Sequence, residues 1–329
     1  MSRFSEPQWL SPALPVMAVI RLGSALGFAA PTMARVLETI FLTTRMPRAL
    51  RRYQPDEHDV FITCFSKSGT NWAMQIAQQL AWHGRAEFDH IHDVVPWPEA
   101  RFAHIASLHQ SPPGGPSPTG LRVIKTHLPA TLVPYDPRAR YITVLRDPKA
   151  VMVSAYYFVL GVFGQLERIS FDQWYEMACR SGPVANAWAN HAASYWAWRD
   201  RPNVLVLTYA EMKDDLSGTV RRFAEFMGLT PGDEVLAEVT RRASFEYMKA
   251  HESQFCPPTL PLRGTSAPPL MMRRGQARSS NELMTPARQA ELDQLTRARL
   301  RRLGCDLPYD ELFGSAANPG RPSSDPDRG

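Results

Sequence analysis

A short loop of small and basic residues, positions 65–72, has the composition of an anion-binding turn. Its sequence is F-S-K-S-G-T-N-W, in which Gly69 allows a tight turn, so that successive backbone N–H groups point at one anion. Lys67 adds a positive charge, and Ser68 and Thr70 add hydroxyl donors. A Walker A loop needs the order GxxxxGK[ST], whereas here the lysine precedes the glycine. The pattern predicts phosphate or sulfate binding and disfavours a conventional ATPase or GTPase, and an ordinary strand–turn–helix corner is the structural alternative.

A histidine and a lysine stand two residues apart at the end of a second apolar run. The sequence is V-I-K-T-H-L-P, and Lys125 and His127 can face the same side of a strand. A neutral histidine beside an acceptor hydroxyl can take its proton near neutral pH. The residues alone leave a hydrogen-bonded structural histidine equally open.

Two further basic segments have the residue types that bind a phosphate. Arg146 follows an apolar run, and Ser154 lies two turns into the helix predicted after it. Arginine suits this role because its planar fork bonds two oxygens at once. More than a hundred residues later come Arg273, Arg274 and Gly275. A surface Arg–Asp pair and a solvated basic turn are the structural alternatives.

These residues need a scaffold, and the hydrophobic pattern predicts one. Apolar runs rich in β-formers at 59–65, 121–126, 141–145 and 204–208 predict four buried strands. Helical patterns lie between and after them, including one opening with Asn71 as its cap and one starting at Pro148. Alternation of strands and helices predicts an α/β fold, with a central parallel sheet flanked by helices on both faces. No repeat or clear linker divides it.

Four motifs in this order resemble those of the family of sulfotransferases that use 3′-phosphoadenosine 5′-phosphosulfate (PAPS) as sulfonate donor. They are S-K-S-G-T-N-W at 66–72, K-T-H-L-P at 125–129, R-D-P-K at 146–149 running on to Ser154, and R-R-G at 273–275. Weaker similarity covers 207–213 and 243–248, and the whole resemblance covers roughly residues 55–315. The sequence departs from the family at Ser66, at Ala243 and at 278–280, where proline, threonine and G-D-W are usual.

The resemblance implies a P-loop-like nucleotide-binding fold and a role for each matching residue. His127 would be the general base, with Lys67 and Lys125 as catalytic cations. The remaining donor-binding residues would be Ser68, Gly69, Thr70, Asn71, Trp72, Arg146, Ser154, Tyr209, Phe245, Arg273, Arg274 and Gly275. The expected reaction is in-line displacement, moving a sulfonate group from PAPS to a hydroxyl or amine. A kinase-like transferase and a non-catalytic nucleotide-binding protein are the alternatives.

Aromatic residues near these motifs predict the acceptor side. Trp97, Phe102, Tyr157 and Phe158 could wall an apolar pocket, although each could equally be an ordinary core residue. A small-molecule or lipid acceptor is expected, and its identity is left open.

Composition narrows the partners. The chain of 329 residues carries a net charge of +5, which suits an anionic ligand but is too small and scattered for nucleic acid. Four well-separated cysteines give no metal or redox spacing and favour a cytoplasmic location. The His90, His92, Asp93, His104 and His109 group fits no common metal site, so no metal is expected.

The two ends of the chain differ from the middle. Residues 1–55 read as an N-terminal helical arm, 56–314 as the sulfotransferase domain, and 315–329 as a disordered tail. The apolar run at 16–30 is too short to span a bilayer and predicts a helix docked on the protein's own surface. Peripheral membrane contact through this arm is the alternative. The oligomeric state is left open.

Overall fold

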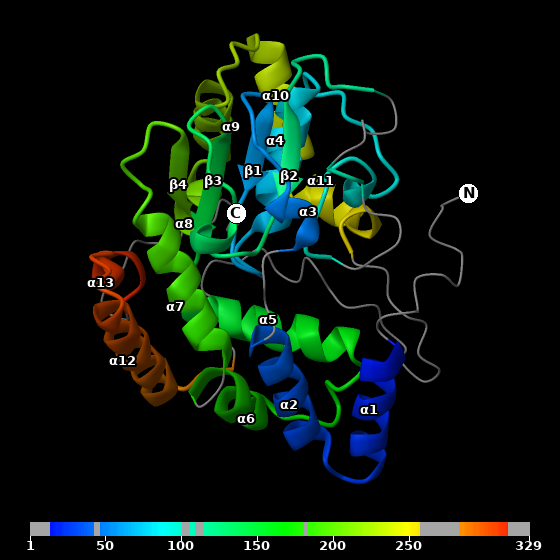
Figure 1. Cartoon of the computed structure of the whole chain (residues 1–329), viewed down its shortest axis with the longest axis vertical. Helices are drawn as coiled ribbons and strands as arrows, with labels where there is room; N and C mark the ends of the chain where they lie inside the picture. The colour runs from blue at the N-terminus through cyan, green and yellow to red at the C-terminus, as the bar shows by residue number, and fades with distance from the viewer. Residues whose placement is uncertain are drawn as a thin grey trace, which may run out of the picture.

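Four parallel strands form the sheet at the centre of the molecule (Figure 1). They are β1 (Asp59–Ile62), β2 (Arg122–Lys125), β3 (Arg140–Leu145) and β4 (Val204–Thr208), in the spatial order β2-β1-β3-β4. All four predicted strands are present. The structure is a computed structural model, and it describes residues 14–42, 47–100, 106–108, 115–180, 183–256 and 283–314.

Side chains alternate between the two faces of the sheet, and helices cover both. Val60 and Ile62 pack in one apolar cluster with the helices α4, α9 and α10. Phe61 points the other way, into a cluster with Tyr141 and with Leu50 of α3. This period of two is what a strand buried on both faces requires, and it confirms the predicted fold class. The helices of this part are α3 (Arg48–Arg51), α4 (Thr70–Ala81), α8 (Tyr209–Asp214), α9 (Leu216–Phe226), α10 (Asp233–Arg242) and α11 (Phe245–Ala250).

A layer of helices lies below the sheet, and α5 passes across beneath it (Figure 1). These helices share a third apolar cluster, whose largest fully buried side chains include Trp174 and Trp188. The elements of this layer are α1 (Leu14–Ala25), α2 (Ala29–Leu42), α5 (Pro148–Val162), α6 (Phe171–Trp174), the π-helix η5 (Tyr175–Arg180), α7 (Pro183–Trp196), α12 (Pro286–Arg302) and α13 (Tyr309–Phe313). Three short 3₁₀ turns are η3 (Ile91–Asp93), η4 (Ala130–Leu132) and η6 (Glu252–Gln254).

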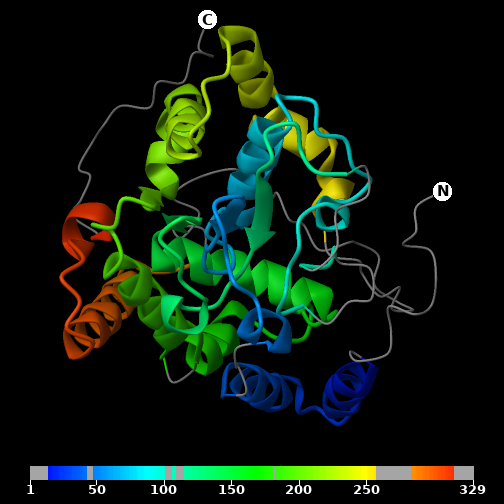
Figure 2. The same ribbon diagram turned by 45° about the horizontal axis from the view of Figure 1, so that its top comes forward.

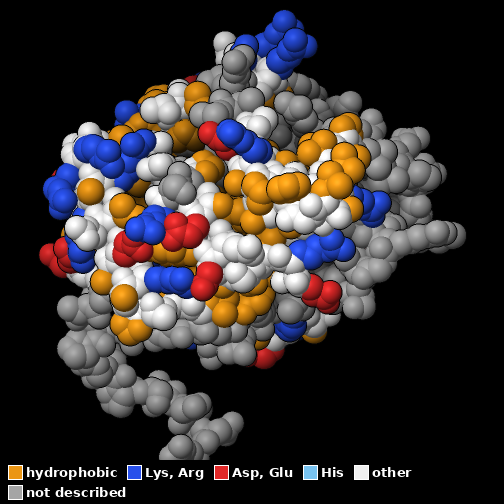
Figure 3. All heavy atoms as spheres, turned by 90° about the horizontal axis from the view of Figure 1, so that it is seen from below, with side chains coloured by type: hydrophobic (Ala, Val, Ile, Leu, Met, Phe, Trp, Pro, Cys, Tyr) orange, Lys and Arg blue, Asp and Glu red, His pale blue; other side chains and the backbone are white. Residues whose placement is uncertain are grey.

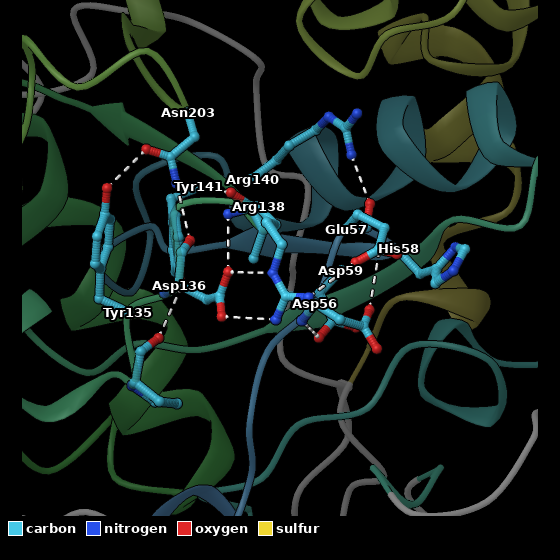
Figure 4. Close-up of polar contacts among 12 residues, drawn as sticks. Asp56, Glu57, His58, Asp59, Tyr135, Asp136, Arg138, Arg140, Tyr141 and Asn203 are labelled. Atoms are coloured by element: carbon cyan, nitrogen blue, oxygen red, sulfur yellow. Dashed lines mark hydrogen bonds and ion pairs between the residues drawn. The ribbon is translucent and has the colours of Figure 1, made fainter.

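Structural hydrogen bonds fasten the amino-terminal end of the strands (Figure 4). The Tyr141 hydroxyl donates to the Pro134 carbonyl (2.8 Å) and accepts from the Asp136 N–H (2.9 Å). Asn203 donates to the Asp136 carbonyl (3.0 Å) and accepts from the Tyr135 hydroxyl (3.0 Å). These contacts hold β3 and β4 in place, and they leave the opposite, carboxyl end of the sheet for a binding site.

The N-terminal arm differs from the expected single helix. The run at 16–30 breaks at a turn, where Gly27 has a φ of 82°, and α1 and α2 form a hairpin. The inner face is docked as predicted, because Ile20 and Met33 are fully buried in the lower cluster. The predicted tail at 315–329 lies outside the described residues, and the division of the chain at residue 55 stays a prediction.

Candidate active site

The anion-binding loop connects β1 to α4 and has a strained backbone. Gly69 has a φ of 97° and Lys67 a φ of 66°. Both values lie in the left-handed region, which residues other than glycine rarely adopt, so the strain falls on Lys67. A Cβ atom on Gly69 would stand 3.0 Å from the Tyr209 ring. The Ser68 hydroxyl is buried and has no hydrogen-bond partner among the described residues. A buried orphan donor in such a loop fits a site for an anion.

The predicted cap of the helix after this loop is wrong. Gly69, not Asn71, is the N-cap of α4, and Thr70 is its first residue. The Asn71 side chain instead donates to the Phe255 carbonyl (3.2 Å). It thereby ties the loop to the segment after α11.

Lys67 and Arg146 meet at the carboxyl end of the central strands. The Arg146 guanidinium donates to the Lys67 carbonyl (2.8 Å) and lies over the Tyr209 ring, 4.3 Å from its centroid. The Lys67 ammonium lies 4.0 Å from the centroid of the Phe158 ring. Burial, together with the nearby charge of Arg146, lowers the pKa of Lys67 to about 7. Two cations from separate strands therefore share one desolvated corner.

The His127 ring is held in one tautomer. Its Nδ1 lies 2.7 Å from the Cys64 carbonyl, so this nitrogen carries the proton and donates it there. Nε2 is then the basic nitrogen. Burial and the charge of Lys125 hold the pKa of His127 well below its usual range, which keeps the ring neutral at neutral pH.

Lys125 is buried beside an aromatic ring and a second histidine. Its Nζ lies 3.5 Å from the centroid of the Trp97 ring and 3.3 Å from His92 Nε2. His92 Nδ1 lies 2.9 Å from the Val95 carbonyl, so Nδ1 donates there and Nε2 accepts from the lysine. Burial lowers the pKa of Lys125 to about 7.

Two residues that the sequence did not single out for this site support the histidine and the lysine. Glu99 accepts hydrogen bonds from the Thr126 hydroxyl (2.8 Å) and from the His127 backbone N–H. His92, considered from sequence only as a metal ligand, holds Lys125 instead. The nearness of Glu99 to Trp97 in the chain was the one signal that could have pointed to it.

The residues predicted on the adenine side also gather. Trp72 and Tyr209 meet edge to face with ring centroids 5.5 Å apart. The Trp72 indole N–H donates to the Ala243 carbonyl (2.7 Å), and Phe245, two residues further on, is 38% exposed. Because Ala243 is used here through its backbone, the missing threonine side chain leaves this contact intact.

Three of the remaining predicted site residues lie on α5, and the others lie outside the part of the chain that the structure describes. Ser154 and Phe158 stand one turn apart on α5, and Tyr157 lies beside Phe158. Phe102 and residues 273–275 lie outside the described residues. Within the described part of the chain, no group of three or more His, Cys, Asp or Glu residues is arranged to hold a metal ion.

The fold and these residues define a class of protein. A parallel sheet with a glycine turn at its carboxyl end, two buried lysines and a neutral histidine is the arrangement expected of a group-transfer enzyme with a P-loop-like fold. The family model of the sulfotransferase domain matches residues 57–304. The chain belongs to the PAPS-dependent sulfotransferase family.

Individual relatives agree with this assignment. The chain is 27% identical to Sulfotransferase 2A1 of Macaca fascicularis over 264 residues, covering 78% of this chain and 87% of that protein. It is 30% identical to Sulfotransferase 1E1 of Cavia porcellus over 207 residues, covering 61% and 69%.

Solved structures share the fold. A retinol dehydratase in complex with retinol and PAP superposes with a TM-score of 0.62 at 19% identity, covering 79% of this chain and 85% of that one. Mouse sulfotransferase SULT7A1 complexed with PAP gives a TM-score of 0.58 at 21% identity, covering 80% and 91%.

Proposed function

We propose that this sulfotransferase moves the sulfonate of PAPS to a hydroxyl or amine of a small-molecule or lipid acceptor, with His127 as general base. The observation that carries the proposal is the hydrogen bond from His127 Nδ1 to the Cys64 carbonyl (2.7 Å). It fixes the tautomer that has a basic Nε2. The low pKa of the ring keeps that nitrogen unprotonated at neutral pH.

The residues of the loop suit the donor. The phosphosulfate of PAPS carries the sulfonyl group on a phosphate, which is the leaving group. The buried Ser68 hydroxyl and the backbone N–H groups at the Gly69 turn could donate hydrogen bonds to its oxygens. Lys67 and the loop N–H groups would stabilise negative charge on the leaving phosphate, and Lys125 would neutralise the sulfonyl oxygens. Arg146 and Ser154, with residues 273–275, would bind the 3′-phosphate. Trp72, Tyr209 and Phe245 would hold the adenine.

The acceptor would lie between the aromatic residues next to His127. The Trp97 ring stands edge-on to His127 with centroids 5.5 Å apart, and the Phe158 ring of α5 lies beside Lys67. Tyr157, next to Phe158 on α5, would extend the apolar wall. Retinol dehydratase has been crystallised with retinol and with androsterone, both apolar alcohols. An apolar alcohol or phenol is therefore the first acceptor class to test here.

The N-terminal hairpin favours a peripheral contact with a membrane from the cytoplasmic side. Ten large hydrophobic side chains are exposed in the described part of the chain, and half of them lie on α1, α2 and the turn between them. These five are Val19, Leu22, Leu26, Phe28 and Ile40. The face seen from below in Figure 3 carries a patch of hydrophobic side chains. Among the described residues no helix is long and apolar enough to cross a bilayer.

A transfer assay tests the proposed reaction. Radiolabelled PAPS is incubated with the protein and a panel of alcohols, phenols, amines and glycolipids, with Lys67→Met as the background control. We expect label in at least one acceptor with the unmodified protein and almost none with the variant. Label in no acceptor, or release of label to water alone, would contradict the proposed reaction.

A further inference from the structure

Three predicted site cations in the described part of the chain, Lys67, Lys125 and Arg146, each lie over an aromatic ring. Lys67 Nζ stands 4.0 Å from the Phe158 centroid, Lys125 Nζ 3.5 Å from the Trp97 centroid, and Arg146 Cζ 4.3 Å from the Tyr209 centroid. All three distances are within the roughly 6 Å over which a ring face attracts a cation.

The two lysine contacts join the donor side of the site to the acceptor side. Phe158 comes from α5, one turn beyond Ser154, whereas Lys67 comes from the loop after β1. Trp97 comes from the segment between η3 and β2 and also stands edge-on to His127. Each ring therefore contacts a lysine with one part of its surface, and the remaining part would line the proposed acceptor pocket.

We propose that Phe158 and Trp97 are positioning residues, which hold the ammonium groups of Lys67 and Lys125 on their ring faces as well as lining the acceptor pocket. The role of these rings in catalysis rests on the proposed function. The contacts between the lysines and the rings are present in the protein without donor or acceptor.

The physical reason is the cost of burying two like charges close together. Burial removes water from both ammonium groups and lowers the pKa of each. The charge of Arg146 lowers the pKa of Lys67 further, and the charge of Lys67 lowers that of Lys125. A ring face offsets part of the desolvation free energy, because the negative charge density on the face attracts a desolvated cation. The ring thus favours the charged form that donor oxygens need, and it fixes the direction from which the ammonium group approaches them.

Other charged groups around the two lysines enter any titration. Among the described residues, the groups that interact with Lys67 are Arg146, Glu252, Cys256, Lys125 and His127. The groups that interact with Lys125 are Glu99, Lys67, Cys64, His90, His92 and His127. The test below leaves all of them unchanged and alters only the rings.

An NMR titration of the lysine side chains, isotope-labelled at Cε, measures the effect directly in the protein without donor. The sequence has only five lysines, Lys67, Lys125, Lys149, Lys213 and Lys249, so their signals can be assigned by substitution. Phe158→Leu keeps an apolar side chain of similar size but removes the ring. We expect it to lower the titration midpoint of Lys67 by about half a unit to one unit, while the midpoint of Lys125 does not fall. Phe158→Tyr keeps the ring and should retain the Lys67 midpoint.

The second ring gives the reciprocal result. Trp97→Leu should lower the midpoint of Lys125 and not that of Lys67, and Trp97→Phe should restore most of it. Phe226→Leu, at a partly buried phenylalanine on α9, is the control and should move neither. Affinity for 3′,5′-diphosphoadenosine should fall severalfold in Phe158→Leu only, because Lys125 is assigned to the sulfonyl oxygens, which this nucleotide lacks.

Unchanged or raised midpoints in both leucine variants would overturn the inference, because the rings would then be apolar walls and nothing more. This readout needs neither donor nor acceptor. It can therefore fail while the proposed reaction stands, and it can succeed even if the transfer assay fails.

Discussion

At the scale of single residues, His127 has the most specific predicted task. Its Nδ1 is committed to the Cys64 carbonyl, and its backbone N–H is held by Glu99. We expect His127→Ala to lower the transfer rate by about 10²–10⁴-fold, because general-base catalysis is worth about that much. The measurement is the initial rate with saturating PAPS and an active acceptor.

Donor binding is the control for that variant. Calorimetry should show nearly unchanged affinity of His127→Ala for 3′,5′-diphosphoadenosine, since the imidazole is assigned to the acceptor. A variant that turns over at close to the normal rate would remove His127 from the mechanism. Loss of donor affinity would instead mean that His127 helps to build the donor site.

Buried neutral histidines also predict how stability depends on pH. Burial lowers the pKa of His191 to about 3, and the pKa values of His92 and His127 lie well below 6.5. Below about pH 6.5 the unfolded chain therefore binds more protons than the native protein, so the free energy of unfolding falls as pH falls. Each such histidine contributes up to about 1.4 kcal/mol per pH unit. Urea unfolding between about pH 7 and pH 5 measures the slope.

His191→Leu isolates one of these contributions. It removes a titrating group that lies outside the predicted site, so the slope should become shallower by up to about 1.4 kcal/mol per pH unit whatever its effect at neutral pH. An unchanged slope would show that His191 is protonated to the same degree in both states.

At the scale of elements, the sequence predicted what is local and missed what is distant. The strand before the loop, the left-handed turn at Gly69 and the helix after it follow from contiguous residues, and the structure has all three. The pairing of His92 with Lys125 and of Glu99 with Thr126 and His127 joins segments about thirty residues apart. Periodicity and turn chemistry do not predict contacts of that kind, which packing decides.

The start of α5 is anchored to the C-terminal helices by a buried ion pair. Lys149 Nζ bonds Asp293 of α12 (2.6 Å) and the Phe313 carbonyl of α13 (2.7 Å), and Tyr309 donates to the same carboxylate (2.7 Å). Lys149→Met should lower the free energy of unfolding by about 3–5 kcal/mol, because Asp293 would stay buried without its cation. Chemical denaturation measures it.

A double substitution separates the charge from the packing. Lys149→Met with Asp293→Leu removes both charges and should recover a large part of the lost stability. If the double variant is as unstable as the sum of the two single variants, the ion pair is not the anchor and side-chain packing is.

At the scale of the whole molecule, the N-terminal hairpin stands out because large hydrophobic side chains on its outer face are exposed to solvent. Figures 1 and 2 place it at one end, below α5, with its tip away from the sheet. The sequence predicted a docked helix but not a turn at Gly27, because the apolar run at 16–30 continues through the turn into the start of α2. The apolar run at 16–30 also did not predict that only one face of the hairpin would be buried.

Flotation with liposomes tests the membrane contact. Replacing Leu22, Leu26 and Phe28 with glutamine should abolish flotation of the full chain with anionic vesicles, since apolar insertion drives such binding. The matched control replaces three exposed leucines elsewhere, Leu166, Leu295 and Leu303, and should float normally. Absence of flotation in the unmodified protein, or equal flotation of both variants, would rule out a membrane role for the hairpin.

The proposed donor site is one that binds a nucleotide carrying a 3′-phosphate. Arg146 is held by the Lys67 carbonyl and the Tyr209 ring at the donor end of the sheet, and Arg273, outside the described residues, is predicted to join it there. Without a 3′-phosphate these charges would lose two or three charge-assisted bonds of about 1.5–3 kcal/mol each.

Calorimetric titration with 3′,5′-diphosphoadenosine and with 5′-AMP is therefore the most direct test. We predict that the diphosphate binds at least roughly a hundredfold more tightly. The Arg146→Ala, Arg273→Ala double variant should lose most of that difference. Equal binding of the two nucleotides by the unmodified protein would contradict the assignment of the donor site.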